Sequence, residues 1–279
     1  HALLLASRGA AVVVNDLGGD VAGEGANASA ADQVVAEIEA AGGVAVAEHS
    51  SVADAAGGAA IVAKAIEAFG RLDIVVNNAG ILRDKSFVNM TPELLQPVLD
   101  VHLGGAVNVT RPAFAHLKEQ GYGRILFTTS GSGMMGTVGQ AKDGAAKMGL
   151  IGLMNVHKIE GAKYDIKVNA VAPIALTRMT EGLFGGIVDL FLPEQFSPAV
   201  AYLVSEDCEL TGEIWSVGGG SISRFFIALT DGYLKKREEG KLTIEDVAAH
   251  VREIRKETDY IVPFSSKDEF GKLGPRLAK

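Results

Sequence analysis

Short apolar runs rich in β-branched residues alternate with longer helical patterns along most of this 279-residue chain. Continuous apolar runs of this length are typical of strands buried on both faces of a sheet. Strands that alternate with helices pair in parallel through right-handed crossovers, so the sequence predicts an α/β fold with a doubly wound, Rossmann-like, mostly parallel sheet. Its ligands are expected at the carboxyl ends of the strands. The predicted strands are 10–15, 44–47, 73–77, 124–129, 166–171 and 214–217, and the predicted helices are 32–41, 56–69, 91–101, 103–120 and 142–162.

The alternating pattern ends near Gly220, and this change predicts the domain organisation. Residues 1–220 are expected to form one Rossmann domain, because their length suits a single large hydrophobic core. Residues 221–279 are richer in charge and contain one predicted helix with a capping threonine, 243–258. This segment is too short for a robust core of its own. We therefore interpret it as a C-terminal extension that packs on the main domain or on a neighbouring subunit.

Charge and cysteine content narrow the range of partners and compartments. The net charge is −8 and the pI is about 5.3, which disfavours nucleic acid and anionic membranes because both attract basic surfaces. Cys208 is the only cysteine, so an intrachain disulfide is excluded and a reducing compartment fits. No run approaches the ~20 apolar residues of a membrane span and no signal peptide is visible, so we expect a cytoplasmic protein. The histidines show no ligand spacing, and no metal site is expected.

Three motifs near predicted strand ends contain candidate chemical groups. Ser130 follows the strand 124–129 and begins a glycine-rich loop, thirteen positions before Asp143. Lys147 follows Asp143 by four residues, within the predicted helix 142–162. The sequence NNAG follows the strand 73–77. Each motif also has a plain structural interpretation, because Asn and Gly favour any strand-to-loop turn and a loop serine commonly satisfies backbone groups.

Together these motifs resemble the short-chain dehydrogenase/reductase family over residues 1–220. The segment GQAKDGAAKMGLIGL resembles the family helix that carries a Tyr-x-x-x-Lys pair, and SVGGG resembles the family's final strand and turn. The segments VVVNDLGG, NNAGILRDKSF and LDVHLGGAVNVTRPA are most similar to the (3R)-hydroxyacyl-CoA dehydrogenases, including that domain of the peroxisomal multifunctional β-oxidation enzymes. The resemblance implies NAD-dependent oxidation of a 3-hydroxyacyl-CoA or a related hydroxy compound.

The resemblance also implies roles for individual residues. Ser130 would polarise the substrate oxygen, and Lys147 would bind the ribose and lower the pKa of the family's tyrosine. His102 stands where many members have an asparagine that helps a proton relay. Asp16, at a strand end, would bind the adenosine ribose and select NAD over NADP, although a plain loop aspartate fits equally well. The other positions expected to lie along the cofactor are Asn77, Ala79, Gly80, Pro173 and Thr177.

The family's catalytic tyrosine is replaced by Asp143 in this chain. A carboxyl group has an unperturbed pKa of about 3.9, and we expect Lys147 to lower it further and leave an ionised, poor acid. The aspartate is also shorter than a tyrosine. Lys142 precedes it, and a charged pair at a helix start predicts a solvated N-terminus that the helix dipole favours. Ser50 stands where the resemblance predicts an aspartate that contacts adenine.

The family's glycine-rich diphosphate loop, Thr-Gly-x-x-x-Gly-x-Gly, precedes the position of His1 in relatives and is missing here, together with the first, central strand. The strands 10–15 and 73–77 would then have unpaired edges inside the protein. Such edges are costly because buried backbone groups need hydrogen-bond partners. We therefore expect residues upstream of His1 to supply this strand in the natural protein.

The sequence leaves three functional hypotheses open. The first is an NAD-dependent dehydrogenase of a 3-hydroxyacyl-CoA, with standalone activity impaired by Asp143. The second is a catalytically inactive subunit that pairs with an active paralogue through the helices 103–120 and 142–162. As partners we expect an acyl-CoA or another small substrate, and either a homo-oligomer or a hetero-oligomer with a paralogue. The third is an enzyme without hydride transfer, which uses Asp143 with Lys142 or Lys147 for acid–base chemistry but has no evident second acid.

Overall fold

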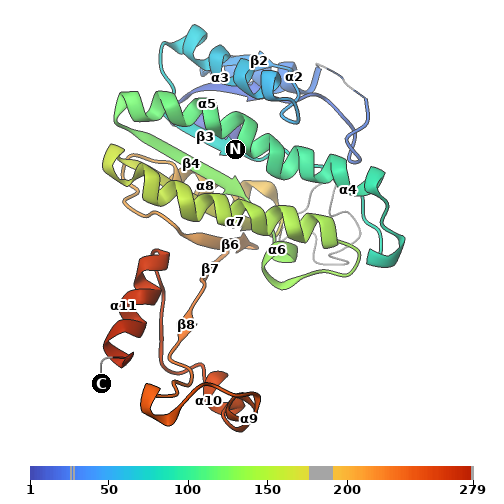
Figure 1. The fold of residues 1–279 in the computed structure, drawn as a ribbon. Coiled ribbons are helices and arrows are strands. Elements are labelled where there is room, and N and C mark those ends of the chain that lie inside the picture. Colours follow the sequence, from blue (N-terminus) through green and yellow to red (C-terminus); the bar gives the residue numbers. More distant parts are fainter. Residues whose placement is uncertain (26, 28, 176–190, 278–279) are drawn as a thin grey trace. The chain divides into compact units, whose positions relative to one another are not determined.

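The computed structural model describes residues 1–25, 27, 29–175 and 191–277, and the chain forms two compact units, His1–Phe225 and Phe226–Lys279. The first unit confirms the predicted α/β class, with a Rossmann-like and mostly parallel arrangement of strands (Figure 1). Its strands are β1 Ala11–Asn15, β2 Val44–Glu48, β3 Ile74–Asn77, β4 Gly123–Thr128, β5 Ile166–Pro173, β6 Ile214–Gly218 and β7 Ser221–Phe225. Its helices are α1 Ala2–Ser7, α2 Ser29–Ala40, α3 Ala55–Phe69, α4 Pro92–Leu99, α5 Gly105–Gln120, α6 Gly131–Met135, α7 Ala141–Gly161 and α8 Ser197–Leu203.

The strands of the first unit fall into two sheets. β1 pairs in parallel with β2, and a second sheet has the order β3-β4-β5-β6-β7, in which β7 alone runs antiparallel to its neighbour. β1 and β3 are not hydrogen-bonded to each other, so each has one edge without a strand partner within the described residues. These are the two edges for which the sequence predicts a central strand.

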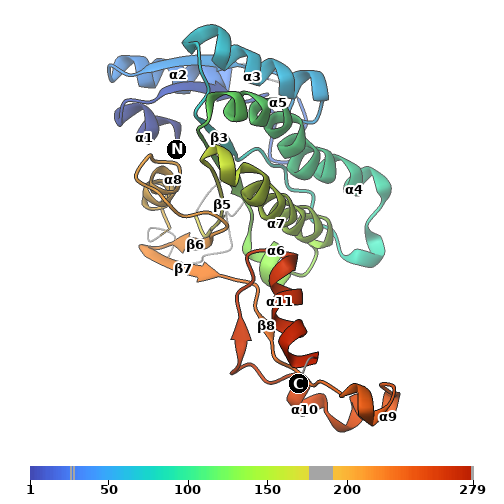
Figure 2. The ribbon, with the colours of Figure 1, turned by 60° about the vertical axis from the view of Figure 1, so that its left-hand side comes forward.

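Helices cover both faces of the strands, as a doubly wound fold requires (Figure 2). The helices α3, α5 and α7 bury one face, and α1 and α8 contribute to the core on the other face. β4 shows why both faces need to be covered, because all six of its residues are buried. Ile125 and Phe127 pack into the first core while Leu126 between them packs into the second, so a continuous apolar run satisfies both faces.

The helical pattern predicted over 91–101 and continued over 103–120 is confirmed, and the join between its two parts is π-helical. A π-helical segment, Asp100–Gly104, continues α4 directly into α5. Pro97 lies inside α4 and has no N–H, so it leaves the carbonyl of Glu93 without its helical donor. The guanidinium of Arg83 donates to that carbonyl oxygen at 3.4 Å, which helps the helix to contain the proline.

The predicted last strand, 214–217, is followed by another strand, which corrects the expectation that the sheet ends there. Gly219 and Gly220 both have positive φ, 57° and 77°, and connect β6 to β7 in a tight hairpin. A Gly-Gly pair is a known signal for such turns because both positions require positive φ. The first unit therefore extends to Phe225, five residues beyond the predicted domain boundary.

The second unit contains more structure than the single helix predicted for it. That helix, 243–258, is instead divided into α9 Ile244–Ala249 and α10 Val251–Ile254, and a further helix, α11 Ser266–Leu277, was not predicted. The predicted cap is confirmed, because the Thr243 hydroxyl accepts a hydrogen bond from the Asp246 N–H. β8 Leu229–Thr230 pairs with β9 Tyr260–Ile261. Lys272 of α11 donates to the Leu229 carbonyl at 2.7 Å and thereby fastens α11 to this small sheet.

The close crossing of α3 and α5 gives a stability prediction. A Cβ on Gly58 would lie 2.6 Å from the backbone carbonyl of Asn108, which Pro112 leaves without its helical donor. Backbone cannot yield as a side chain can, so Gly58→Ala is expected to lower the free energy of unfolding by about 2 kcal/mol in urea denaturation. Gly271→Ala is the control, because a Cβ there meets no atom within 4 Å. This variant should not lower the free energy of unfolding. Equal stability of the two variants would contradict this account.

Candidate active site

A buried lysine joins the end of β4 to helix α7. Lys147 Nζ donates to the Thr128 carbonyl oxygen at 2.7 Å, and the Thr129 hydroxyl donates to the Lys147 carbonyl oxygen at 2.9 Å. Burial lowers the pKa of Lys147 from 10.5 to about 8, although Asp143 acts in the opposite direction. The structure therefore places this lysine at the carboxyl end of a central strand, the edge where the fold binds ligands.

Ser130 lies at the same strand end and caps the short helix α6. Its hydroxyl oxygen accepts a hydrogen bond from the Gly133 N–H at 3.2 Å and lies 2.6 Å from the hydroxyl oxygen of Ser132. A Cβ on Gly133 would lie 2.9 Å from the Lys147 Cβ, so α6 and α7 are in close contact. Ser130 is therefore brought next to Lys147, as its spacing from the helix motif predicts.

Asp143 and Lys142 depart from the sequence prediction, because both are buried. Asp143 is 4% exposed and Lys142 is 0% exposed, so the prediction of a solvated helix N-terminus is wrong. Burial raises the pKa of Asp143, and Asp84 adds to this effect, while Lys142 and Lys147 oppose it. The predicted lowering of this pKa is therefore also wrong, because desolvation outweighs the attraction of two lysines. Within the described chain, Asp143 Oδ2 and Lys142 Nζ have no hydrogen-bond partner.

His102 belongs to the π-helical segment and contacts the loop after β3. The Ile81 N–H donates to His102 Nε2 at 2.9 Å, and the Ile81 carbonyl oxygen lies 2.8 Å from the same nitrogen. Burial, followed by the charge of Lys147, lowers the pKa of His102 from 6.5 to about 4, although the Ile81 carbonyl opposes this. The ring is therefore neutral at physiological pH. The position of this ring also explains why residue 80 is a glycine, because a Cβ there would lie only 3.0 Å from the imidazole.

The NNAG turn is tied to its neighbours by side chains. Asn77 donates to the Thr110 hydroxyl at 3.0 Å, and the Thr128 hydroxyl donates to the side-chain oxygen of Asn78 at 3.2 Å. These bonds hold β3 against α5 and β4, so the amide of Asn77 has a structural partner. Ala79 is exposed at the same edge. A small exposed residue there leaves room for a flat ligand to lie against the turn.

The two remaining predicted cofactor regions lie at other strand ends. Asp16 follows β1, is exposed, and accepts a hydrogen bond from the Gly18 N–H at 2.6 Å. It therefore shapes its loop and still presents a carboxylate at the carboxyl edge. Pro173 is the last residue of β5, opposite Val217 of β6. Thr177 lies outside the described residues.

The loop after β3 contributes residues that the sequence analysis did not assign to the site. Asp84 accepts a hydrogen bond from the Gln140 amide at 2.9 Å, and the Lys85 N–H donates to the Gly139 carbonyl at 3.0 Å. Gln140 is the N-cap residue of α7, so this loop borders the start of the helix that carries Asp143. The segment ILRDKSF, already prominent in the sequence, was the available signal.

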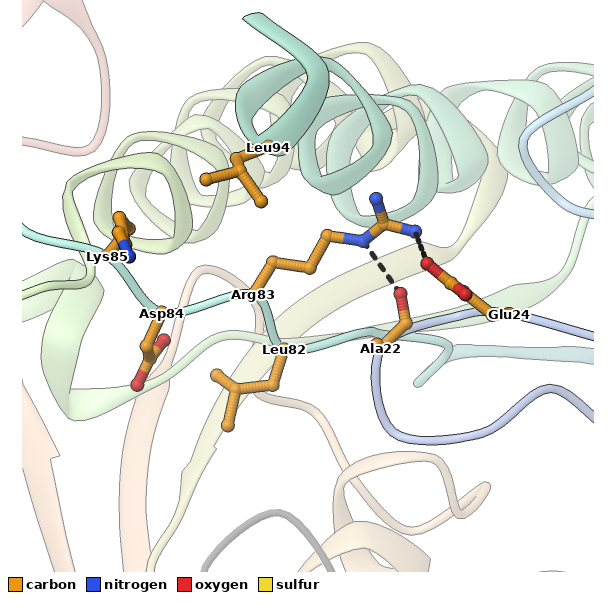
Figure 3. A pocket seen from close by; sticks show the side chains of 7 residues that line it. All are labelled: Ala22, Glu24, Leu82, Arg83, Asp84, Lys85 and Leu94. Carbon is orange, nitrogen blue, oxygen red and sulfur yellow. Dashed lines mark hydrogen bonds and ion pairs between the residues drawn. The ribbon is translucent and has the colours of Figure 1, made fainter. Parts of the chain in front are cut away.

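A pocket of about 330 Å³ opens beside this loop (Figure 3). Arg83 crosses it, with Nε donating to the Ala22 carbonyl at 2.7 Å and a second nitrogen 3.8 Å from the Glu24 carboxylate. Another pocket, of about 280 Å³, is lined by Arg71, Asp73 and other residues before β3 and β4. Because that second pocket lies at the amino ends of parallel strands, it is on the edge opposite the candidate site.

Across the residues that the structure describes, no three metal-ligating side chains come together in a possible binding group. None of the described helices has the length and apolar character needed to cross a bilayer.

A doubly wound sheet with a serine, a lysine and an acidic residue at its carboxyl edge defines a Rossmann-type oxidoreductase scaffold. The model of the short chain dehydrogenase family matches residues 4–184. The chain is 47% identical to a short-chain type dehydrogenase/reductase of Mycobacterium tuberculosis, over 91% of this chain and 88% of that protein. This protein therefore belongs to the short-chain dehydrogenase family.

Two solved structures and one further relative extend this finding. The full-length peroxisomal multifunctional enzyme type 2 of Drosophila melanogaster superposes with a TM-score of 0.83 at 36% identity, covering 99% of this chain and 46% of that one. A short chain dehydrogenase of Mycobacterium avium gives a TM-score of 0.78 at 39% identity, covering 93% and 92% of the two chains. Peroxisomal multifunctional enzyme type 2 of Mus musculus is 46% identical over 88% of this chain and 33% of its own length. The chain thus spans less than half of these multifunctional relatives.

The low pKa of His102 gives a pH-dependence prediction. Between pH 6.5 and about 4 the unfolded chain binds a proton that the folded chain does not, so stability falls as the pH falls through this window. This difference in the pKa of His102 between the unfolded and folded chain corresponds to about 3 kcal/mol of folding free energy. Urea denaturation of His102→Asn should show a flatter pH dependence in this range. His116→Asn, at an exposed position on α5, is the control and should keep the wild-type slope. An unchanged slope in His102→Asn would contradict the assignment.

Proposed function

We propose that this protein is an NAD-dependent oxidoreductase of 3-hydroxyacyl-CoA thioesters, with proton transfer impaired by Asp143. The observation that carries the proposal is the bond from the Lys147 ammonium to the Thr128 carbonyl at the carboxyl end of β4, two residues before Ser130 and one helical turn after Asp143 on α7. Similarity to proteins named hydratase-dehydrogenase-epimerase and acetoacetyl-CoA reductase supports a CoA thioester as substrate.

The residues present fit a dinucleotide at this edge. Asp16 and Ala79 are exposed after β1 and β3, and the Lys147 ammonium lies at the end of β4, where it bonds the Thr128 carbonyl. The dinucleotide supplies the hydride acceptor when it is bound. In this proposal Ser130 donates a hydrogen bond to the substrate oxygen, and the carboxylate of Asp143 takes the proton of the substrate hydroxyl.

Asp143 performs this proton transfer less well than a phenol would. Its pKa is raised by burial, which brings the carboxyl closer to the range where it can hold a proton at neutral pH. The side chain is nevertheless shorter than tyrosine and has no hydroxyl on a rigid ring. Proton transfer by a positioned group contributes ~10²–10⁴-fold to a rate, so a poorly placed acid costs a large part of the activity.

We also propose that the protein forms an oligomer through α5 and α7, with itself or with an active paralogue. Phe114 of α5 and His157 of α7 are in ring contact, with centroids 5.4 Å apart, so the two helices are neighbours. Val107 and Val156 expose 38% and 51% of their surface on these helices, which supports an apolar contact surface.

A cytoplasmic location is also proposed, and the free, buried Cys208 is consistent with it.

Restoring the tyrosine tests the proposed dehydrogenase. Asp143→Tyr is expected to raise kcat for NADH formation from a 3-hydroxyacyl-CoA by about 10²–10⁴-fold. Asp143→Phe is the matched control, because it fills the same space without a hydroxyl and should give no gain. Both are made together with Lys142→Asn, since removing the Asp143 charge would leave a buried ammonium without compensation. Equal rates for the two variants would contradict the proposal.

The raised pKa of Asp143 also favours a second candidate, an acid–base reaction without hydride transfer. Such a reaction needs the carboxyl itself, so Asp143→Asn, compared with Lys142→Asn alone and made in that background, should abolish hydration or dehydration of an acyl-CoA while leaving NADH binding intact. The measurement is the absorbance of the 2-enoyl thioester in the absence of dinucleotide. Turnover that survives in Asp143→Asn would rule this candidate out.

A further inference from the structure

Glu48 ends β2 at the carboxyl edge of the sheet and has a carboxylate that is held rigidly. Its Oε2 accepts hydrogen bonds from the Asn15 amide at 2.6 Å and from the Ser50 N–H at 3.0 Å. Its Oε1 accepts a hydrogen bond from the Ser50 hydroxyl at 2.5 Å. Three donors from two neighbouring strand ends thus fix the position of one negative charge.

The fixed carboxylate retains hydrogen-bonding capacity. A carboxylate has about four acceptor positions on its two oxygens, and the three bonds above leave one position on Oε1. The group is only partly buried, so an incoming donor can reach it. Glu48 is therefore organised to accept one more hydrogen bond at this edge.

Glu48 lies beside the carboxylate proposed to bind the ribose. Asn15 of β1 is directly opposite Glu48 in the parallel register, and Asp16, the next residue, donates its N–H to the Glu48 carbonyl at 3.2 Å. Because the ends of β1 and β2 are adjacent, the base of a nucleoside whose ribose bonds Asp16 can reach the end of β2. The exocyclic amino group of adenine is a hydrogen-bond donor, whereas hypoxanthine has a carbonyl oxygen in its place.

We propose that Glu48, held by Ser50 and Asn15, is the residue that recognises the adenine amino group of the bound dinucleotide; this inference rests on the proposed NAD-dependent function. The serine at position 50 then does not remove the negative charge expected for base recognition. It positions that charge instead, because its hydroxyl lies 2.5 Å from the Glu48 carboxylate.

The test compares NADH with reduced nicotinamide hypoxanthine dinucleotide by titration calorimetry on the full-length protein. We expect NADH to bind about tenfold more tightly, as for loss of one hydrogen bond to a charged acceptor. Glu48→Gln presents an amide N–H in place of the acceptor and should reduce the preference to less than about twofold. Glu37→Gln makes the same charge change on the exposed face of α2 and should keep the preference. Thermal unfolding checks that both variants are folded.

The outcomes separate this inference from the proposed function. Equal binding of the two dinucleotides to the wild-type protein overturns the role of Glu48 and leaves the dehydrogenase proposal in place. No binding of either dinucleotide overturns both. Because coenzyme A also contains adenine, it is titrated alone. If Glu48→Gln weakens coenzyme A and leaves NADH unchanged, Glu48 recognises the substrate, and its assignment to the dinucleotide is overturned.

Discussion

The contact between Lys147 and the Thr128 carbonyl is the interaction on which the candidate site depends. It lies in the core, where a charged group needs a strong acceptor, and it fixes α7 relative to the end of β4. Thr129 adds a second bond between the same two elements. The positions of Ser130 and Asp143 follow, because one lies just beyond β4 and the other lies one turn before Lys147 on α7.

Burial sets the chemistry of this site more strongly than charge pairing does. Lys142, Asp143 and Lys147 are all buried within about one and a half turns of one helix. The two ammonium groups attract the carboxylate, yet desolvation has the larger effect and raises its pKa. Asp143 therefore brings a buried carboxyl group to this helix, and the adjacent lysine provides the opposite charge.

The structure also shows how a hydrogen-bonding group that one residue lacks is supplied by another side chain. Ser50 lacks the carboxylate that the family resemblance predicts, but Glu48 brings its own carboxylate to the serine hydroxyl. Likewise, Pro97 removes a helical donor from Glu93, and Arg83 donates to the exposed carbonyl from a loop after β3. Glu48 is only two residues from Ser50, whereas Arg83 reaches α4 from a separate loop.

The sequence by itself determined the fold class, the places of Ser130 and NNAG at strand ends, the place of Lys147 on a long helix, and the family. Strand and helix periods are local properties, and a motif keeps its spacing wherever the chain packs. The sequence did not predict the burial of Asp143, the hairpin β6–β7 or the bond between Glu48 and Ser50. Burial and side-chain contacts depend on which elements pack together, and desolvation then decides how a carboxyl behaves. Only the tertiary structure could decide those features.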